Sequence, residues 1–356
     1  MSTDRSSKLA DSPGLRSHRE SKRRKIGFLV GMTCVLCVLW IVGIAVGSVT
    51  YPIREVITAL AQRGPETQQL AIWHVRIPRV LAATVAGGGL AVAGAAMQSV
   101  LRNPLGAPFT LGISHAAAFG AAVTIAVGTA GLEASMFSIS IQTVGAFAGA
   151  MTATTVILLL VTYREATPET LILTGVAIGS LFSAGLATIQ YFATDAEVAE
   201  IVYWTFGDVS RAGWDEIALM TVVFVCGLAY FIYHSWSYDI LDAGTETAMS
   251  LGVDVEKLRI RGMAVASLVT AVLISFVGII GFVGLIAPHI VRMVIGGTER
   301  FLLPASALVG AALLVAADAF ARTVVSPIVL PVGIVTSFLG APLFLYLIIK
   351  GRRYWG

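Results

Sequence analysis

The chain has 356 residues and a formal net charge of +3, and 56% of its residues are hydrophobic while only 13% are charged. This composition lies far outside the range of soluble globular domains. It therefore excludes a soluble protein and indicates a chain that lies largely within a membrane. We expect no nucleic-acid partner.

The first 25 residues are polar and basic, and Lys22-Arg-Arg-Lys25 stands directly before the first apolar run. We predict a disordered cytoplasmic tail over residues 1–25 that also anchors the topology on anionic lipid. A cleavable signal peptide is disfavoured because the apolar run is too long and lacks a small-residue cleavage site. Cys34, Cys37 and Cys226 fall inside apolar runs, which favours packing residues over a redox pair or a disulfide framework.

Runs of about 20 apolar residues recur along the rest of the chain, and each is long enough to cross the hydrocarbon core as a helix. We therefore predict an all-α, polytopic membrane protein with a single transmembrane domain over residues 26–356. Gly and Pro in the eighth run suggest a broken or partly re-entrant helix, which needs protein or water around its freed backbone groups. The ten expected spans are 27–49, 80–101, 110–129, 139–162, 170–193, 216–235, 260–280, 282–296, 304–323 and 333–350.

Lys and Arg positions orient these spans. With the N-terminus inside, eighteen of the 24 basic residues fall on the cytoplasmic side and six fall outside. This bias follows the positive-inside rule, so both termini are expected in the cytoplasm. An odd number of spans would break the pattern.

Three glycine pairs have the small-xxx-small spacing that lets helix backbones approach closely. We favour packing within one subunit for them, although spacing alone leaves a dimer contact open. The pairs are Gly43/Gly47, Gly145/Gly149 and Gly175/Gly179.

The motifs of common enzymes are missing from the sequence. It has no Gly-x-x-x-x-Gly-Lys-Ser/Thr loop, no His-Glu-x-x-His, no Gly-x-Ser-x-Gly and no Cys or His cluster with metal-ligand spacing. We therefore expect no catalytic residue, no metal site and no cofactor bound directly. Only Asp318 lies plainly inside a span, whereas ion-coupled transport normally uses carboxylates in several spans. Uphill transport would then need energy from a partner.

Several motifs resemble FecCD-type permeases, the membrane subunits of ATP-driven importers for iron-siderophores, haem and cobalamin. The resemblance covers roughly residues 50–350 and implies a dimeric permease that works with two ABC ATPase subunits and an extracellular or periplasmic solute-binding protein. The motifs are Arg76-Ile-Pro-Arg79, Gly94-Ala-Ala-Met-Gln98, Leu101-Arg-Asn-Pro-Leu105, Gly281-Phe-Val-Gly-Leu-Ile-Ala-Pro-His289, Leu303-Pro304, Ala317-Asp318, Leu330-Pro-Val-Gly333 and Gly340-Ala-Pro342.

Residues 239–258 form the longest cytoplasmic loop, which is mixed polar and apolar and could hold two short helices with a break at Gly252. A plain connector between spans is one interpretation. The loop also resembles the coupling helices that sit in a groove of the ATPase subunit. On that resemblance Ala248, Leu251 and Gly252 are the candidates for ATPase contact.

Three arginines stand at the outer ends of spans: Arg76 and Arg79 before the second, and Arg322 at the end of the ninth. Taken alone, Arg322 favours a local ion pair with Asp318, four residues earlier on the same helix face. In the resembled family, arginines at the three matching positions receive glutamates from the solute-binding protein. The resemblance thus implies that Arg76, Arg79 and Arg322 dock this partner, as exposed charges that give orientation and fast encounter.

The loop after the second span contains two prolines and a glycine, which prevent a continuous helix. A tight turn between spans explains it without any function. The resemblance instead implies a cytoplasmic gate formed by Asn103, Pro104 and Leu105. His289 matches the family pattern, but we favour a core histidine over a ligand.

Between the fifth and sixth spans, an acidic outer segment runs from Asp195 to Glu216. The resemblance implies a short extracellular helix here, at the entrance below the binding protein. Tyr203, Trp204 and Phe206 fit an interfacial aromatic belt at least as well.

These observations favour an importer permease in a bacterial cell membrane, most simply for a ferric siderophore. Haem and cobalamin remain alternatives, and the sequence leaves open whether the dimer is homomeric or heteromeric. An ion-coupled secondary transporter is the rival class, but it would need more buried carboxylates than the sequence offers. A membrane scaffold would leave the arginine trio and the coupling loop without a role.

Overall fold

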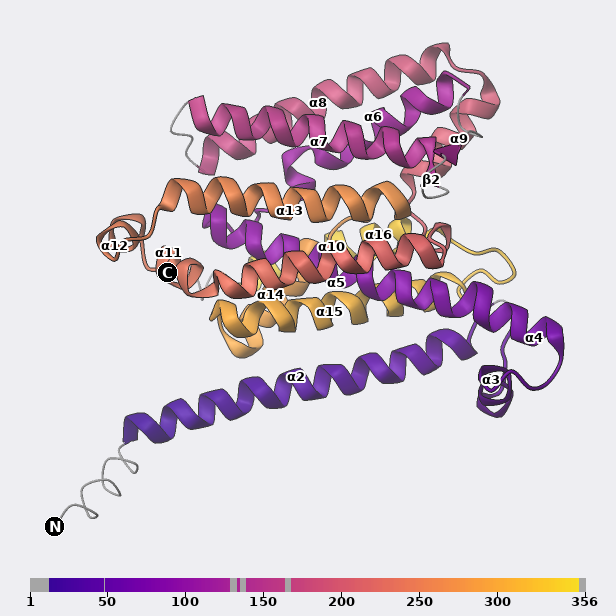
Figure 1. Cartoon of the computed structure of the whole chain (residues 1–356), viewed down its shortest axis with the longest axis horizontal. Coiled ribbons are helices and arrows are strands. Elements are labelled where there is room, and N and C mark those ends of the chain that lie inside the picture. The colour runs from indigo at the N-terminus through magenta and orange to yellow at the C-terminus, as the bar shows by residue number, and fades with distance from the viewer. Residues whose placement is uncertain (1–12, 48, 129–132, 135–138, 164–167, 352–356) are drawn as a thin grey trace.

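The computed structural model describes residues 13–47, 49–128, 133–134, 139–163 and 168–351, which form a helical bundle (Figure 1). Seven of its helices are long and apolar enough to cross a membrane. Three shorter apolar helices accompany them, so every expected span coincides with a helix. The long helices are α2 (Pro13–Ala45), the continuous helix α4–η1–α5 (Glu66–Leu101), α7 (Ile141–Tyr163), α8 (Pro168–Phe192), α10 (Trp214–Tyr233), α13 (Val255–Val277) and α15 (Glu299–Ala321); the shorter ones are α6 (Ile113–Ala126), α14 (Val283–Ile295) and α16 (Val332–Gly351).

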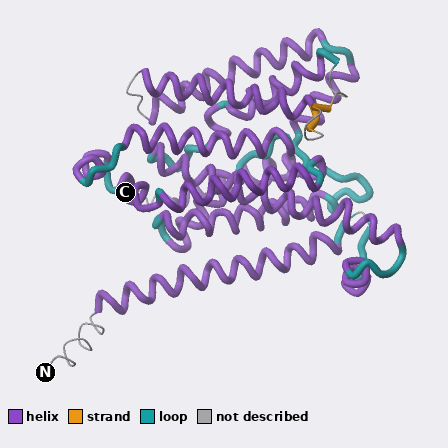
Figure 2. Tube along the Cα trace, viewed as in Figure 1, coloured by secondary structure: helices purple, strands orange, loops and turns teal. Residues whose placement is uncertain are grey.

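Short elements join these helices at both ends of the bundle, and the tube in Figure 2 shows how little of the described chain is not helical. A pair of two-residue strands is the only β structure in the described ranges. The short elements are α3 (Ile53–Leu60), η2 (Pro108–Leu111), β1 (Glu133–Ala134), β2 (Ile139–Ser140), α9 (Asp195–Thr205), η3 (Val209–Arg211), α11 (Ser235–Asp242) and α12 (Thr245–Ser250).

Helix α5 (Ile77–Leu101) lies at the centre of the bundle, between α15, α13, α14 and α10. From Pro78 onward nearly all of its residues are buried. A helix that is apolar all round must be enclosed by other helices, and its many Ala and Gly residues allow this enclosure to be tight. Helices α6, α7 and α8 form a second group, which contacts the central one mainly through α7 and α13.

The predicted glycine pairs pack inside the subunit, as we favoured. A Cβ on Gly149 would lie 2.1 Å from the Ala116 carbonyl oxygen of α6, and one on Gly175 would lie 2.7 Å from the Cα of Leu111. A Cβ on Gly43 would lie 2.9 Å from the Val80 side chain of α5. These glycines therefore set distances between neighbouring helices of one chain.

The tightest such approach joins α5 and α14. A Cβ on Gly94 would lie only 1.8 Å from the Gly284 carbonyl oxygen, which is backbone and cannot turn aside. We expect Gly94→Ala to lower the melting temperature in detergent strongly, since the helices must separate. Gly31→Ala is the control, because nothing lies within 4 Å of the added methyl group. Equal melting temperatures for the two variants would contradict the packing.

The break expected within the eighth span is not found, because α14 runs unbroken from Val283 to Ile295 and the helical structure is interrupted before it instead. Helix α13 ends at Val277, and α14 begins only at Val283 and continues through Pro288. The connection takes positive φ angles at Gly278 (75°) and Phe282 (67°). Because α14 has 13 residues, it is about 20 Å long and too short to cross the bilayer alone.

The start of α2 and the end of α16 lie at the same end of the bundle, together with α11 and α12 (Figure 1). The charge count assigns this end to the cytoplasm. Residues 1–12 of the expected disordered tail lie outside the described residues. Residues 13–25, however, are helical, because α2 begins at Pro13, so the helix extends beyond the apolar run into the basic segment.

Candidate functional sites at the two ends of the bundle

The three arginines predicted for docking converge at the outer end of α5 and α15. All three are buried, with 8%, 8% and 5% exposure for Arg76, Arg79 and Arg322. Arg76 donates hydrogen bonds to the carbonyl oxygens of Ile44 and Ala45 at the end of α2. Carbonyl groups at a helix C-terminus lack partners within the helix, and they carry partial negative charge that attracts a guanidinium group.

Asp318 connects the other two arginines. Its carboxylate accepts a hydrogen bond from Arg79 Nε at 2.7 Å and forms an ion pair with Arg322 Nε at 3.0 Å, and it is almost fully buried. Arg322 also donates to the carbonyl oxygens of Gly43 and Val46. The favoured local pair between Arg322 and Asp318 is thus confirmed. We name Arg76, Arg79, Arg322, Asp318 and Asp208 the outer charge cluster.

Asp208 is the cluster member whose side chain is most exposed to solvent. Its carboxylate lies 3.2 Å from Arg79 Nη2, and its side chain is 29% exposed against 9% for Arg79. The N–H groups of Arg79 Nη2 do not point at the Asp208 carboxylate well enough for a hydrogen bond, so this nitrogen remains a buried donor without an acceptor. Two carboxylates therefore face three guanidinium groups, which leaves the cluster with an excess of positive charge.

The sequence interpretation was wrong about exposure. It treated the three arginines as exposed charges at the mouths of spans, whereas the continuous helix α4–η1–α5 starts at Glu66, so that Arg76 and Arg79 lie inside it. Neighbouring backbone carbonyls and Asp318 then enclose the side chains. The docking role itself remains a prediction, and the cluster offers mainly Arg79 Nη2 for it.

The loop after α5 forms a tight turn. Arg102 adopts a left-handed conformation with φ 46°, and the side-chain oxygen of Asn103 accepts a hydrogen bond from the Leu105 amide at 2.8 Å. Asn103 and Pro104 are half-buried, and Leu105 is 42% exposed. The turn interpretation is thus confirmed, while the gate role of these three residues stays a prediction.

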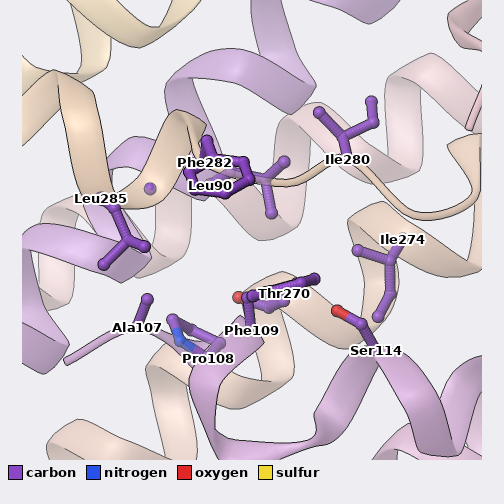
Figure 3. Close-up of a pocket in the computed structure, with 11 residues that line it drawn as sticks. Leu90, Ala107, Pro108, Phe109, Ser114, Thr270, Ile274, Ile280, Phe282 and Leu285 are labelled. Atoms are coloured by element: carbon purple, nitrogen blue, oxygen red, sulfur yellow. The ribbon is translucent and has the colours of Figure 1, made fainter. Parts of the chain in front are cut away.

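A small pocket lies beside this loop, between α5, α6, α13 and α14 (Figure 3). Pro108 and Phe109 face Leu90, Phe282 and Leu285 across it, and the hydroxyl groups of Ser114 and Thr270 border it. His289 is buried in α14, as we favoured, although its Nε2 has no hydrogen-bond partner.

At the inner end, residues 239–258 (the coupling segment) hold the end of α11, all of α12 and the start of α13. The helices are interrupted at Ala243 and Gly244, between α11 and α12, and again at the predicted Gly252 (φ 81°), between α12 and α13. Leu251 (57%) and Met249 (63%) are exposed. Ala248 is fully buried, so it is corrected from a surface contact to a core residue.

Behind the coupling segment lies an inner charge cluster that the sequence interpretation missed. Glu299, the first residue of α15, is fully buried; its carboxylate accepts from Ser99 of α5 and lies 3.5 Å from Arg292 Nη2 of α14. Its backbone amide donates to Asp239 Oδ1 of α11 at 2.8 Å. Burial raises the pKa of the half-buried Asp239 carboxyl, although this hydrogen bond opposes the rise.

The acidic outer segment forms the expected short helix, α9. Thr194 caps it by accepting from the Glu197 amide, and the Glu197 carboxylate accepts from the Thr194 amide in return. Tyr203 is exposed but Trp204 is buried, so the aromatic residues do not form one interfacial belt. Pro331–Ile334, at the start of α16, lies against this segment through a hydrogen bond from Gly333 to Gly207.

The sequence of the chain matches the FecCD transport family over residues 35–350. The chain belongs to this family. It is 53% identical to a protein of Methanocaldococcus jannaschii described as an ABC transporter permease (MJ0087), over 92% of this chain and 95% of the relative. It is 41% identical to the cobalamin import system permease BtuC of Halobacterium salinarum, over 80% of this chain and 74% of that permease. A solved structure described as an inward-facing metal-chelate type ABC transporter superposes with a TM-score of 0.79 at 29% identity, and the match covers 90% of this chain and 98% of the other.

Other FecCD relatives carry different solutes in their names. The hemin transport system permease HmuU of Yersinia pestis is 35% identical over 80% of this chain and 85% of its own length. The Fe(3+)-citrate import system permease YfmD of Bacillus subtilis is 33% identical over 94% and 99%. The chain is thus an ABC importer permease, a multi-pass membrane protein of a family whose members work with ATPase subunits. The secondary-transporter and scaffold interpretations are excluded by this membership.

Proposed function

We propose that two permease subunits, this chain paired with itself or with a similar permease, form the pathway of an importer for a metal chelate, with a ferric siderophore as the first candidate solute. A solute-binding protein docks outside, and two separate ATPases bind the coupling segments inside. The observation that supports this best is the convergence of Arg76, Arg79 and Arg322 in one cluster with excess positive charge. The chain itself catalyses no covalent step.

The geometry suggests how docking would begin. Arg79 Nη2 is buried and lies within ion-pair distance of Asp208, so an incoming carboxylate from the binding protein would have to displace Asp208 to reach it. Because Asp318 and the α2 carbonyls hold the other guanidinium nitrogens, the arginines are fixed before the partner arrives. Preorganised charges of this kind lower the cost of ordering the interface and speed correct encounter.

Cobalamin is the second candidate solute. The Halobacterium cobalamin permease is more similar to this chain than the hemin and Fe(3+)-citrate permeases are. The three named solutes share one chemistry, since each encloses its metal in an organic ligand. A larger pocket at the start of α16 is lined mostly by apolar side chains together with the hydroxyl groups of Thr205 and Ser337, which suits the exterior of such a chelate.

Uptake by a strain that lacks only this gene tests both proposals. The cells would receive labelled ferric citrate, ferric siderophores, haemin and cobalamin in separate experiments. Loss of ferric-siderophore uptake, restored by the intact gene, supports the first candidate, while loss of cobalamin or haemin uptake alone keeps the importer and replaces the solute. Unchanged uptake of all of them would count against the proposal.

Asp208→Asn is expected to tighten binding of the solute-binding protein by up to about fivefold, because it removes the carboxylate that competes for Arg79. Asparagine keeps the side-chain oxygen that accepts from the Ser210 amide. Titration of the binding protein against the complex in nanodiscs measures the effect. Asp215→Asn is the matched control, since it removes an outer charge that pairs with none of the three arginines. Equal affinities for both variants and the wild type would contradict this docking geometry.

A further inference from the structure

Helix α15 is capped by a residue of the coupling segment. Thr298 occupies its N-cap position but makes no side-chain capping hydrogen bond. Instead, Asp239 of α11, 60 residues earlier, accepts from the Glu299 amide at 2.8 Å. The first amides of a helix lack partners within it, and a carboxylate beside them is stabilised by the positive end of the helix dipole. Asp239 therefore fastens the coupling segment to α15.

This bond ends at a junction of several helices. Beside it, the Glu299 carboxylate contacts Ser99 of α5 and Arg292 of α14. Lys25 of α2 donates to the Thr298 hydroxyl at 2.8 Å. A displacement of α11 would thus act on the inner ends of α15, α5 and α14 together, since buried or half-buried polar contacts hold them to one another, and an exposed contact adds α2.

Helices α5 and α15 are joined along their whole length, side by side in Figure 1. At the inner end Ser99 bonds Glu299, and at the outer end Arg79 bonds Asp318 at 2.7 Å. Between them, a Cβ on Gly87 would lie 2.4 Å from the Gly310 carbonyl oxygen, so the two backbones are in direct contact. The pair spans about 34 Å, the length of 23 helical residues, with little room for one helix to slide against the other.

We propose that the α5–α15 pair is the rigid element that connects the ATPase side to the outer charge cluster, and that Asp239 is the positioning residue that couples the ATPase-driven movement of α11 to it. The inference rests on the proposed function, because it requires the ATPases to act on the coupling segment. Movement then travels from α11 through the Asp239–Glu299 hydrogen bond to α15, and from its outer end to Asp318, Arg322 and Arg79. Docking outside would act on the ATPases along the same path, since coupling between two sites is reciprocal.

Asp254 provides a matched comparison within the same segment. It also caps a helix, accepting from the Lys257 amide at 3.1 Å at the start of α13, and its ion pair with Lys257 is exposed. This carboxylate acts within its own connection and does not join separate helices. Hydrogen bonds from Lys257 lower the pKa of the Asp254 carboxyl, whereas burial raises the pKa of Asp239.

Hydrogen–deuterium exchange of the complete complex with its ATPases tests the inference, with and without Mg-ATP and vanadate. In the wild type we expect exchange to change both in residues 239–252 and in residues 318–326. In Asp239→Ala the inner change should remain, which shows that the variant folds and binds the ATPases, while the outer change falls about fivefold or more. Asp239→Asn should keep most of the outer change because its oxygen still accepts the Glu299 amide, and Asp254→Ala should keep all of it.

Two results would overturn the inference: an outer change in Asp239→Ala equal to that of the wild type, or a wild-type complex whose outer end does not respond at all. Failure of the proposed function looks different. In that case the wild-type chain would assemble with no ATPase, and deletion of its gene would leave uptake of the tested chelates unchanged.

Discussion

Replacing Asp318 with alanine is expected to destabilise the protein severely. The side chain is 1% exposed and its two oxygens pair with Arg79 and Arg322, so the substitution leaves two buried guanidinium groups without their carboxylate. Removing one partner from a buried ion pair typically costs about 3–5 kcal/mol, because the remaining charge stays desolvated. Thermal unfolding in detergent, followed by size-exclusion chromatography of heated samples, measures the loss.

The control is Asp254→Ala, which breaks an ion pair that is just as short, 2.7 Å from Lys257, on the exposed cytoplasmic surface. Exposed pairs contribute little and loss of the α13 cap costs less than loss of a buried ion-pair partner, so its melting temperature should fall much less than that of Asp318→Ala. Asp318→Asn should fall between the two, since the amide oxygen still accepts one hydrogen bond. A wild-type melting temperature for Asp318→Ala would show that the outer charge cluster does not hold α5 and α15 together.

The sequence predicted the architecture well because a membrane imposes simple requirements. Each of the ten expected spans coincides with an apolar helix, since a spanning helix must be long and apolar whatever it packs against. The family resemblance predicted that Arg76, Arg79 and Arg322 dock one partner, but it did not predict that they converge in one cluster. Their burial was not predicted either, because it depends on contacts with carbonyl groups near the end of α2, which lies far from these arginines in the sequence.

The missed residues have the same physical explanation. Glu299 directly follows Gly296-Gly-Thr at the start of an apolar run, and a carboxylate at that position was the available signal for a buried charge. The same pattern is equally typical of an exposed carboxylate in the first turn of a helix. Only the fold places Ser99 and Arg292 beside it and Asp239 over its amide. Ala248 was misplaced for a related reason, because an alanine in a mixed polar and apolar loop does not reveal which face of a short helix turns inward.

A second large effect is expected from Met249→Asp combined with Leu251→Asp. These are exposed apolar side chains of the coupling segment, at 63% and 57%, and single apolar side chains at an interface centre can dominate binding. Burying two carboxylates in the ATPase groove without partners would be unfavourable. We expect the ATPases to stop co-purifying with the permease and uptake to fall by about 100-fold or more, as two anchors of about 1.5 kcal/mol or more each are lost.

Controls separate this effect from misfolding. Because both positions are exposed in the subunit, the double variant should keep its melting temperature, whereas Ala248→Asp, directly beside them but fully buried, should lower it. Met249→Leu combined with Leu251→Met keeps the surface apolar and should retain uptake. If the aspartate variant still bound the ATPases and transported normally, the contact would have to lie elsewhere, and the path from the coupling segment through Asp239 to α15 would lose its starting point. The exposed side chains of Met249 and Leu251 and the buried hydrogen bond of Asp239 are therefore two parts of one connection, and the second can act only if the first binds the ATPase.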